Sequence, residues 1–374
     1  MGRVRVKKVC IVNLNVFSLF CPTGSAPMGG AELDMYNLAQ GLKKYCNVSV
    51  ITGDWGQGDT ENIDGITIYK SFKLKYSFLR ALSVPFVLFR QLYRTNADIY
   101  ISSGAGPEVG LVSLFCMLKR KKYIYRTASE IDCNRTYVKR CGFNGLLFEL
   151  GLFLSTVIVT SVKSHQILIR NSYPMILKRR VSYIPLGINV TLNKIDYEKK
   201  KYILWIARGN SYKRPDIFLE IAQNIPEENF LMIMPEQSSE KLLYERTKNE
   251  AAGLRNVKFI GGVQFSDSQK YYDRARLFVN TSTFEGFTFT LIQSGIAHTP
   301  VAYLSVNPDN VITRFNIGEF GEGNIEVLTK KIKSLLKNKR LWNEKSNSIH
   351  DYVVANHDIN KLSKKWIGLI DLLI

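Results

Sequence analysis

The chain has 374 residues with 45% hydrophobic and 22% charged residues, a composition that excludes a disordered chain and leaves room for two domains, each with its own core. Its formal net charge is +19, and residues 1–190 carry 25 Lys and Arg against 11 Asp and Glu, so the first half holds most of the excess. No uncharged apolar run is long enough to span a bilayer. The six cysteines lack metal-binding spacing, which favours free thiols in a cytoplasmic protein.

Strand and helix patterns alternate along the first half of the chain. We expect strands at residues 9–14, 48–52, 66–69, 99–102, 123–127, 157–160 and 181–184, and helices at 31–44, 78–93, 108–118 and 163–169. After a charged linker at 195–201 the alternation begins again. There we expect strands at 202–206, 230–234, 257–260, 277–279 and 301–304, and helices at 215–223, 239–252, 268–275 and after Gly286.

This alternation predicts parallel, doubly wound sheets with right-handed crossovers. The fold class is therefore α/β, with two Rossmann-like domains facing a cleft. We place them at residues 1–190 and 200–350, and we expect a C-terminal helix at 351–374 that packs back on the first domain. In such folds ligands bind outside the carboxyl ends of the strands, so the segments that follow strands are the candidate site.

The segment at residues 282–300 is the most informative of these. A tight Glu285-Gly286 turn follows a buried strand and opens an apolar helix. The backbone N–H groups at such a helix start have no intrahelical partner and form a ready anion site. A carboxylate beside that site is suited to hydroxyl groups, and sugar phosphates offer both kinds of group.

Two further segments carry glycines or cations after strands. Gly29 and Gly30 precede a helix after the first strand, where a ligand could approach the backbone, although a plain loop-to-helix turn has the same pattern. Arg208 and Lys213 follow the first strand of the second half, beside a helix that begins at Pro215. Two cations there would hold a diphosphate, or they belong to a solvated basic loop.

In this order the segments resemble the retaining glycosyltransferases of family 4, which have the two-domain GT-B fold. The resemblance covers essentially the whole chain and is strongest from residue 205 to residue 301. It implies that Arg208 and Lys213 neutralise the diphosphate of a nucleotide-sugar and that Glu285 contacts the donor sugar. It also implies that the backbone of Gly286, Phe287 and Thr288 holds phosphate and sugar.

The sequence departs from the family pattern at two places. The second glutamate of the family's Glu-x7-Glu motif, which grips the ribose, is Gln293 here; an amide can still bond a hydroxyl but without charge assistance. The family's histidine near the acceptor is absent from residues 125–132. Arg126 is then a candidate for an acceptor phosphate, and Glu130 and Asp132 for acceptor hydroxyls, unless the two carboxylates cap the next helix.

The resemblance implies transfer of a hexose from a nucleotide-diphosphate sugar to an acceptor hydroxyl with retention, in cell-surface polysaccharide or glycolipid synthesis. No Asp-x-Asp sequence is present, and we expect neither a metal nor another cofactor. The alternatives are a nucleotide-sugar epimerase on the same fold and a binding protein without transferase activity.

Basic residues interleaved with large apolar ones at residues 76–94, and the basic run 119–122, suit a helix on an anionic membrane. They suit an ordinary solvated rim equally well. The partners expected are thus the donor, a glycan or lipid-linked glycan acceptor, and an anionic surface at the inner face of the cytoplasmic membrane. No motif supports nucleic acid.

Overall fold

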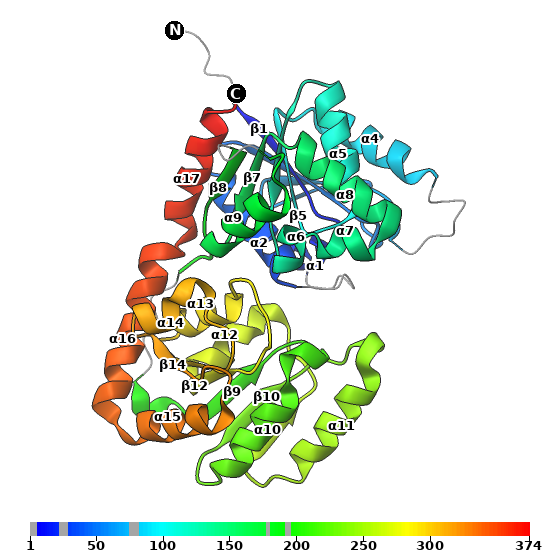
Figure 1. Ribbon diagram of the computed structural model, residues 1–374. Coiled ribbons are helices and arrows are strands. Elements are labelled where there is room, and N and C mark those ends of the chain that lie inside the picture. Colours follow the sequence, from blue (N-terminus) through cyan, green and yellow to red (C-terminus); the bar gives the residue numbers. More distant parts are fainter. Residues whose placement is uncertain (1–5, 22–28, 75–81, 177–179, 191–195) are drawn as a thin grey trace. The chain divides into compact units, whose positions relative to one another are not determined.

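The computed structural model describes residues 6–21, 29–74, 82–176, 180–190 and 196–374 (Figure 1). Two compact units make up the chain. Unit 1 comprises Met1–Asn189 and Asp358–Ile374, and unit 2 comprises Val190–His357. Each unit is a mostly parallel sheet with helices on both faces (Figure 1). The α/β fold class expected from the sequence is confirmed.

Unit 1 is built on an eight-stranded sheet of order β3-β4-β2-β1-β5-β6-β7-β8, parallel except for the β3–β4 hairpin. Its strands are β1 (Lys8–Val12), β2 (Asn47–Thr52), β3 (Thr60–Ile63), β4 (Ile66–Lys70), β5 (Ile99–Ser103), β6 (Lys122–Arg126), β7 (Val157–Thr160) and β8 (Val181–Tyr183). The central strands are buried on both faces, as expected where helices cover a parallel sheet.

Helices cover the two faces of this sheet with separate apolar cores. The described part of unit 1 has the helices α1 (Phe17–Phe20), α2 (Gly30–Leu42), α4 (Val84–Thr95), α5 (Pro107–Leu118), α6 (Glu130–Cys133), α7 (Thr136–Arg140), α8 (Gly142–Leu154), α9 (Lys163–Ser172) and α17 (Ile359–Asp371). One core joins α1, α2 and α17 to the sheet, and the other joins α4, α5, α8 and α9 to it. Sequence reasoning missed α8, because its apolar run is broken by glycines and has no clear helical period.

The C-terminal segment is not one helix over residues 351–374, as the sequence suggested. Helix α16 ends at Asn356, and α17 begins at Ile359 after Asp358, whose carboxylate accepts a hydrogen bond from the Asn360 amide at 2.9 Å. From Asp358 onward the chain belongs to unit 1. There α17 packs closely on α2, where a Cβ at Gly41 would lie 2.2 Å from Ser363 Oγ.

Unit 2 is built on a six-stranded parallel sheet of order β11-β10-β9-β12-β13-β14. Its strands are β9 (Tyr202–Ile206), β10 (Phe230–Ile233), β11 (Val257–Ile260), β12 (Ala275–Asn280), β13 (Val301–Tyr303) and β14 (Gly318–Phe320). The α-helices are α10 (Pro215–Asn224), α11 (Lys241–Ala252), α12 (Phe265–Asp273), α13 (Phe289–Ile296), α14 (Val311–Arg314), α15 (Ile325–Lys337) and α16 (Lys339–Asn356). The short 3-10 helices are η2 (Tyr197–Lys199), η3 (Ser211–Lys213), η4 (Ser238–Glu240) and η5 (Pro308–Asn310).

The strand order of unit 2 reverses direction at β9. The chain builds outward from β9 through β10 to β11, then returns to place β12 on the other side of β9. The crevice outside the carboxyl ends of β9 and β12 is therefore the topological switch point, where open α/β sheets bind their ligands. Within the described residues no helix combines the length and the apolar character that crossing a bilayer requires.

Candidate functional site

The switch point of unit 2 brings Lys213 and Glu285 together. Lys213 ends η3, in the loop after β9, and Glu285 lies in the loop after β12. The Lys213 ammonium donates a hydrogen bond to Glu285 Oε1, and both side chains are mostly buried, at 14% and 13% exposure. The sequence identified Lys213 and Glu285 as separate candidates, and the structure shows that they form one charged pair.

Hydrogen bonds from Thr281 fasten the Lys213 loop to the end of β12. The Thr281 hydroxyl lies 2.7 Å from the carbonyl oxygen of Lys213 and 2.8 Å from that of Arg214. It accepts a hydrogen bond from the Trp205 indole at 2.9 Å. Because these partners are buried or half-buried, protein groups hold the backbone from which the Lys213 side chain extends.

Aromatic stacking holds the same two loops together farther out. The rings of Tyr212 and Phe284 stack with centroids 4.6 Å apart, and the Thr283 amide donates to the Tyr212 carbonyl at 2.9 Å. The Lys213 ammonium lies 5.0 Å from the centroid of the Tyr212 ring. Such a contact adds a modest cation–π attraction to the ion pair.

Ser282 orients the carboxylate of Glu285. Its hydroxyl donates to Glu285 Oε1 at 2.8 Å, and its own amide donates to Asn280 Oδ1 at 2.9 Å. Sequence reasoning missed Ser282, although its place three residues before Glu285 was the available signal. The remaining carboxylate oxygen of Glu285 is chemically able to accept bonds from hydroxyl groups.

The segment Gly286, Phe287 and Thr288 leads into α13 as the sequence suggested. All three residues are half-buried. Thr288 caps α13, since its hydroxyl accepts a hydrogen bond from the Leu291 amide at 3.4 Å, and it lies 2.8 Å from the Tyr303 hydroxyl. The first amides of α13 add the partial positive charge of a helix start to this position.

Arg208 and Gln293 occupy contrasting environments. Arg208 follows β9, its side chain is exposed, and among the described residues none forms an ion pair with it. Gln293 lies on α13 and is 5% exposed, with its amide nitrogen donating to Ser268 Oγ on α12 at 2.8 Å. Arg208 can therefore bind an anion from solvent, whereas the Gln293 side chain is held by its hydrogen bond to Ser268 on α12.

Arg126 is buried and bonded to protein groups, so it does not make the acceptor-phosphate contact that we expected. It is 0% exposed and pairs with Asp34 at 2.8 Å. Its other donors bond the backbone carbonyls of Thr160, Ile184 and Pro185. A guanidinium that is fully buried, with every nitrogen bonded inside unit 1, cannot reach an acceptor.

Asp132 caps a helix, which was the alternative to acceptor binding. Its carboxylate accepts hydrogen bonds from the Ser129 hydroxyl at 3.0 Å, from the Ala128 amide at 2.7 Å and from the Tyr125 hydroxyl at 2.9 Å. Together Ser129 and Asp132 form a capping box at the start of α6. Burial raises the pKa of Asp132, and these hydrogen bonds oppose that rise.

The remaining unit 1 candidates lie at helix starts. Glu130 is exposed in the first turn of α6 and stays a candidate for acceptor hydroxyls. Gly29 caps α2 and Gly30 begins it, at the β1 side of the switch point between β1 and β5. Sequence reasoning missed the turn at residues 104–106 on the β5 side, where Gly104 has a φ of +87°. Across the described ranges no group of three His, Cys, Asp or Glu side chains could hold a metal.

Residues 193–353 match the family model of the glycosyl transferases, group 1, a span that takes in most of unit 2. Several solved structures are similar in fold over nearly the whole length of this chain. Sucrose-phosphate synthase from Thermosynechococcus elongatus is 15% identical with a TM-score of 0.78, covering 98% of this chain and 99% of that one. The chain has a GT-B glycosyltransferase fold.

Two further GT-B structures are similar over nearly their full length. HepE of Anabaena, in complex with UDP and glucose, is 12% identical with a TM-score of 0.76, covering 98% of this chain and 99% of HepE. WaaG, a glycosyltransferase involved in lipopolysaccharide biosynthesis, is 16% identical with a TM-score of 0.71, covering 97% and 99%. No curated protein is significantly similar to this chain in sequence. The family match therefore applies to residues 193–353, and the GT-B fold applies to nearly the whole chain.

Proposed function

We propose that the protein transfers a hexose from a nucleoside-diphosphate sugar to an acceptor hydroxyl with retention of configuration, as the glycosyltransferases of family 4 do. The observation that carries the proposal is the contact between Lys213 and Glu285 at the switch point of unit 2. A cation suited to phosphate and a carboxylate suited to hydroxyls stand side by side there. A sugar joined directly to a diphosphate needs that pair of groups.

In this proposal each side chain acts on one part of the donor. Lys213 and the exposed Arg208 neutralise the diphosphate, and the amides at residues 286–288 bind its oxygens or the sugar. Glu285 turns its carboxylate to the sugar hydroxyls, and Gln293 bonds the ribose. In the free protein Glu285 supplies the counter-charge of Lys213, so a bound donor exchanges one anionic partner of that ammonium for another.

The chemical step requires little of the protein beyond charge stabilisation. The bond between the anomeric carbon and the diphosphate oxygen breaks, and the acceptor oxygen bonds to that carbon on the same face. The acceptor proton passes to an oxygen of the leaving phosphate, which departs as a nucleoside diphosphate. Because negative charge grows on the diphosphate as the bond breaks, Lys213 and Arg208 stabilise the transition state more than the bound donor. The proposed step uses no metal or other cofactor.

For the acceptor we propose a glycan or lipid-linked glycan at the inner face of the cytoplasmic membrane, in cell-surface polysaccharide or glycolipid synthesis. Large apolar side chains are exposed on two helices of unit 1: Phe86 (78%) and Tyr93 (68%) on α4, and Phe143 (73%) and Leu146 (60%) on α8. Exposed basic residues accompany them, including Arg90, Lys139 and Arg140. Leu88 does not take part, because it is buried in the core; Phe78 and Leu79 lie outside the described residues.

A test of the transfer proposal begins with the donor. Thermal unfolding is measured with UDP-, GDP- and ADP-sugars, since a ligand that binds the folded state raises its unfolding temperature. HepE, whose fold the chain shares, was solved with UDP, so UDP-sugars are tried first. The best donor is then incubated with candidate lipid-linked glycans. Release of nucleoside diphosphate with a new glycosidic bond supports transfer, epimer formation without release indicates an epimerase, and binding without turnover indicates a non-catalytic protein.

The membrane proposal has its own test. Vesicles containing phosphatidylglycerol should bind the protein at low salt and release it as salt is added, because screening weakens the attraction of exposed charges. Replacing Phe86 and Phe143 together by serine should abolish the binding, because both exposed apolar side chains are removed. Equal binding to neutral vesicles would contradict the proposal.

A further inference from the structure

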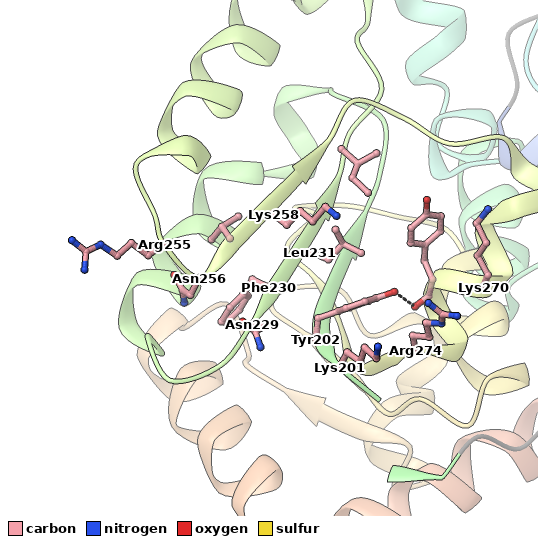
Figure 2. Close-up of a pocket in the computed structure, with 13 residues that line it drawn as sticks. Lys201, Tyr202, Asn229, Phe230, Leu231, Arg255, Asn256, Lys258, Lys270 and Arg274 are labelled. Atoms are coloured by element: carbon pink, nitrogen blue, oxygen red, sulfur yellow. Dashed lines mark hydrogen bonds between the residues drawn. The ribbon is translucent and has the colours of Figure 1, made fainter. Parts of the chain in front are cut away.

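Unit 2 has a second candidate site, a groove of about 550 Å³ on the sheet formed by β9, β10 and β11 (Figure 2). It begins where these strands begin and is bounded on one side by the end of α12. Its lining residues are Lys201, Tyr202, Asn229, Phe230, Leu231, Arg255, Asn256, Val257, Lys258, Ile260, Lys270, Tyr271 and Arg274. Lys213 and Glu285 are not among them, because those residues follow the carboxyl ends of the strands.

The topology of unit 2 explains why this part of the sheet is open. Helices α10, α11 and α15 pack on one face, where Phe230 and Met232 belong to the core. Side chains alternate along a strand, so Leu231 points to the other face, beside its partner Lys258 on β11. On that face α12 leads the chain from β11 back to β12, and the groove lies beside it over the starts of β10 and β11 (Figure 2).

The wall of the groove is strongly cationic. Five of its lining residues are Lys or Arg, and none of the described residues that line it is Asp or Glu. Figure 2 shows Lys258 along the strands, with Lys270 of α12 and Arg274, the residue that follows α12, across from it and Arg255 extending outward. The nearest ion pair is that of Lys270 with Asp267 at 3.1 Å, and both of its side chains are more than half exposed. Such a pair is weak enough for an anion to compete with Asp267.

The spread of these cations selects an extended anion. Lys201 precedes β9 and Arg255 precedes β11, with β10 between them. Neighbouring strands are about 4.8 Å apart, so the backbone at the two ends of the groove is separated by roughly 10 Å. A single phosphate carries at most about two negative charges and cannot neutralise five cations, whereas a chain with several anionic groups can.

The floor of the groove favours sugar rings over nucleobases. Ile260 is half-buried and offers aliphatic surface on this face, against which the C–H face of a sugar ring can pack, and Leu231 lies beside it at 4% exposure. Nucleobases need open aromatic faces on which to stack. The ring of Tyr271 is covered on one face by the Lys270 ammonium, 5.6 Å from its centroid, and the Tyr202 hydroxyl is bonded to the Tyr271 carbonyl at 3.1 Å.

We propose that the groove binds a segment of an acidic oligosaccharide, with its carboxylates or phosphates on the lysines and Arg274 and its rings on the aliphatic floor. This site is separate from the donor site and does not depend on the transfer reaction. A glycosyltransferase that held an acidic chain here would keep that chain close to unit 2 between reactions.

The test uses oligogalacturonate as the acidic probe and its fully methyl-esterified form as the neutral match. Binding of each to the full-length protein is measured by calorimetry at low salt. Replacing Lys258 and Lys270 by alanine should weaken oligogalacturonate binding by at least about tenfold, because two of the cations are removed. The matched control replaces Lys248 on α11 and Lys330 on α15, both exposed on the helices of the opposite face.

We expect no binding of the methyl ester and wild-type affinity in the control variant. The unfolding temperature and the nucleotide-sugar affinity should be unchanged in both variants, which separates a failure of this proposal from a failure of the transfer proposal. Equal weakening in the two variants, or equal binding of the neutral probe, would overturn the assignment. Stronger binding of oligo(dT) or of phosphatidylglycerol vesicles at the groove would overturn it in favour of those ligands.

Discussion

Lys213 and Glu285 are in direct contact, although 72 residues separate them along the chain. The contact arises because β9 and β12 are neighbours in the sheet and both residues follow the carboxyl ends of those strands. Thr281 hydrogen-bonds the backbone carbonyl of Lys213, and Ser282 hydrogen-bonds the carboxylate of Glu285. A charged pair supported in this way is arranged before a ligand arrives, which is what catalysis by charge stabilisation requires.

Removing the cation tests the role in phosphate binding. Lys213→Ala should lower transfer by about 10²-fold or more, since one preorganised charge on the leaving group is lost. Lys213→Arg, which keeps the charge, is the matched control and should retain more activity than the alanine variant. Initial rates of nucleoside diphosphate release provide the measurement, with the unfolding temperature as a check on the fold. Full turnover by the alanine variant would remove Lys213 from the mechanism.

Neutralising the carboxylate should separate donor binding from transfer. Glu285→Gln keeps the shape of the side chain but no longer neutralises Lys213. We expect nucleoside diphosphate to bind as tightly as in the wild type or more tightly, while transfer falls by about 10²-fold because the contact with the sugar loses its charge. Calorimetry with nucleoside diphosphate and rates with the full donor show the two effects. Parallel loss of both would mean that Glu285 is structural.

Gln293 offers a gain-of-function test. Gln293→Glu places a carboxylate where the family's ribose contact is expected, and a charge-assisted bond to a hydroxyl should tighten nucleotide binding by about tenfold. Ser268, whose hydroxyl accepts from the Gln293 amide, can rotate to donate to the new carboxylate. If calorimetry shows unchanged nucleotide affinity in a variant that folds normally, the ribose assignment is wrong.

Arg126 should matter for stability. Arg126→Met leaves Asp34 as an unpaired buried charge, which costs roughly 3–5 kcal/mol of the free energy of unfolding. Chemical denaturation measures this cost. Glu130→Gln is the contrasting change, because that exposed side chain should affect acceptor use and leave stability unaltered. A stable Arg126→Met protein would show that the buried pair with Asp34 does not support unit 1.

A buried lysine should make stability depend on pH. Lys200 is 1% exposed and its ammonium donates to the carbonyls of Asp273 and Ala297 and to the Thr299 hydroxyl. Burial lowers the pKa of Lys200 to about 7. Between that value and the usual pKa of about 10.4, the unfolded chain binds more protons than the folded one, so raising the pH stabilises the fold.

Comparison with Lys200→Met isolates that contribution from the other titrating groups. The free energy of unfolding of the wild type, relative to the variant, should increase as the pH rises from 7 to 9 and should be constant below pH 6. Urea titrations at each pH provide the values. A difference that stays constant or decreases over the upper range would show that the buried lysine keeps an ordinary pKa.

Much of the fold follows from local patterns, since every strand expected from the sequence is present with its ends shifted by at most two residues. That the Lys213 and Glu285 loops meet also follows, because strand-end loops meet at a switch point, whereas the ion pair between the two side chains was not predicted. The role expected for Arg126 was wrong, and Asp132 was left between acceptor binding and helix capping, because a polar residue after a strand has the same sequence signal whether it faces a ligand or packs inside. The groove had no local signal at all, because its cations are scattered from Lys201 to Arg274 and come together only through the strand order.

The most direct test of the central claim is calorimetric titration of the wild type and of Lys213→Ala with the nucleotide-sugar that stabilises the protein most. The account predicts saturable one-to-one binding by the wild type and an affinity at least about tenfold lower for the variant, because the ammonium at the switch point holds the diphosphate. Identical affinities in the two proteins, or no binding of any nucleotide-sugar to the wild type, would contradict it.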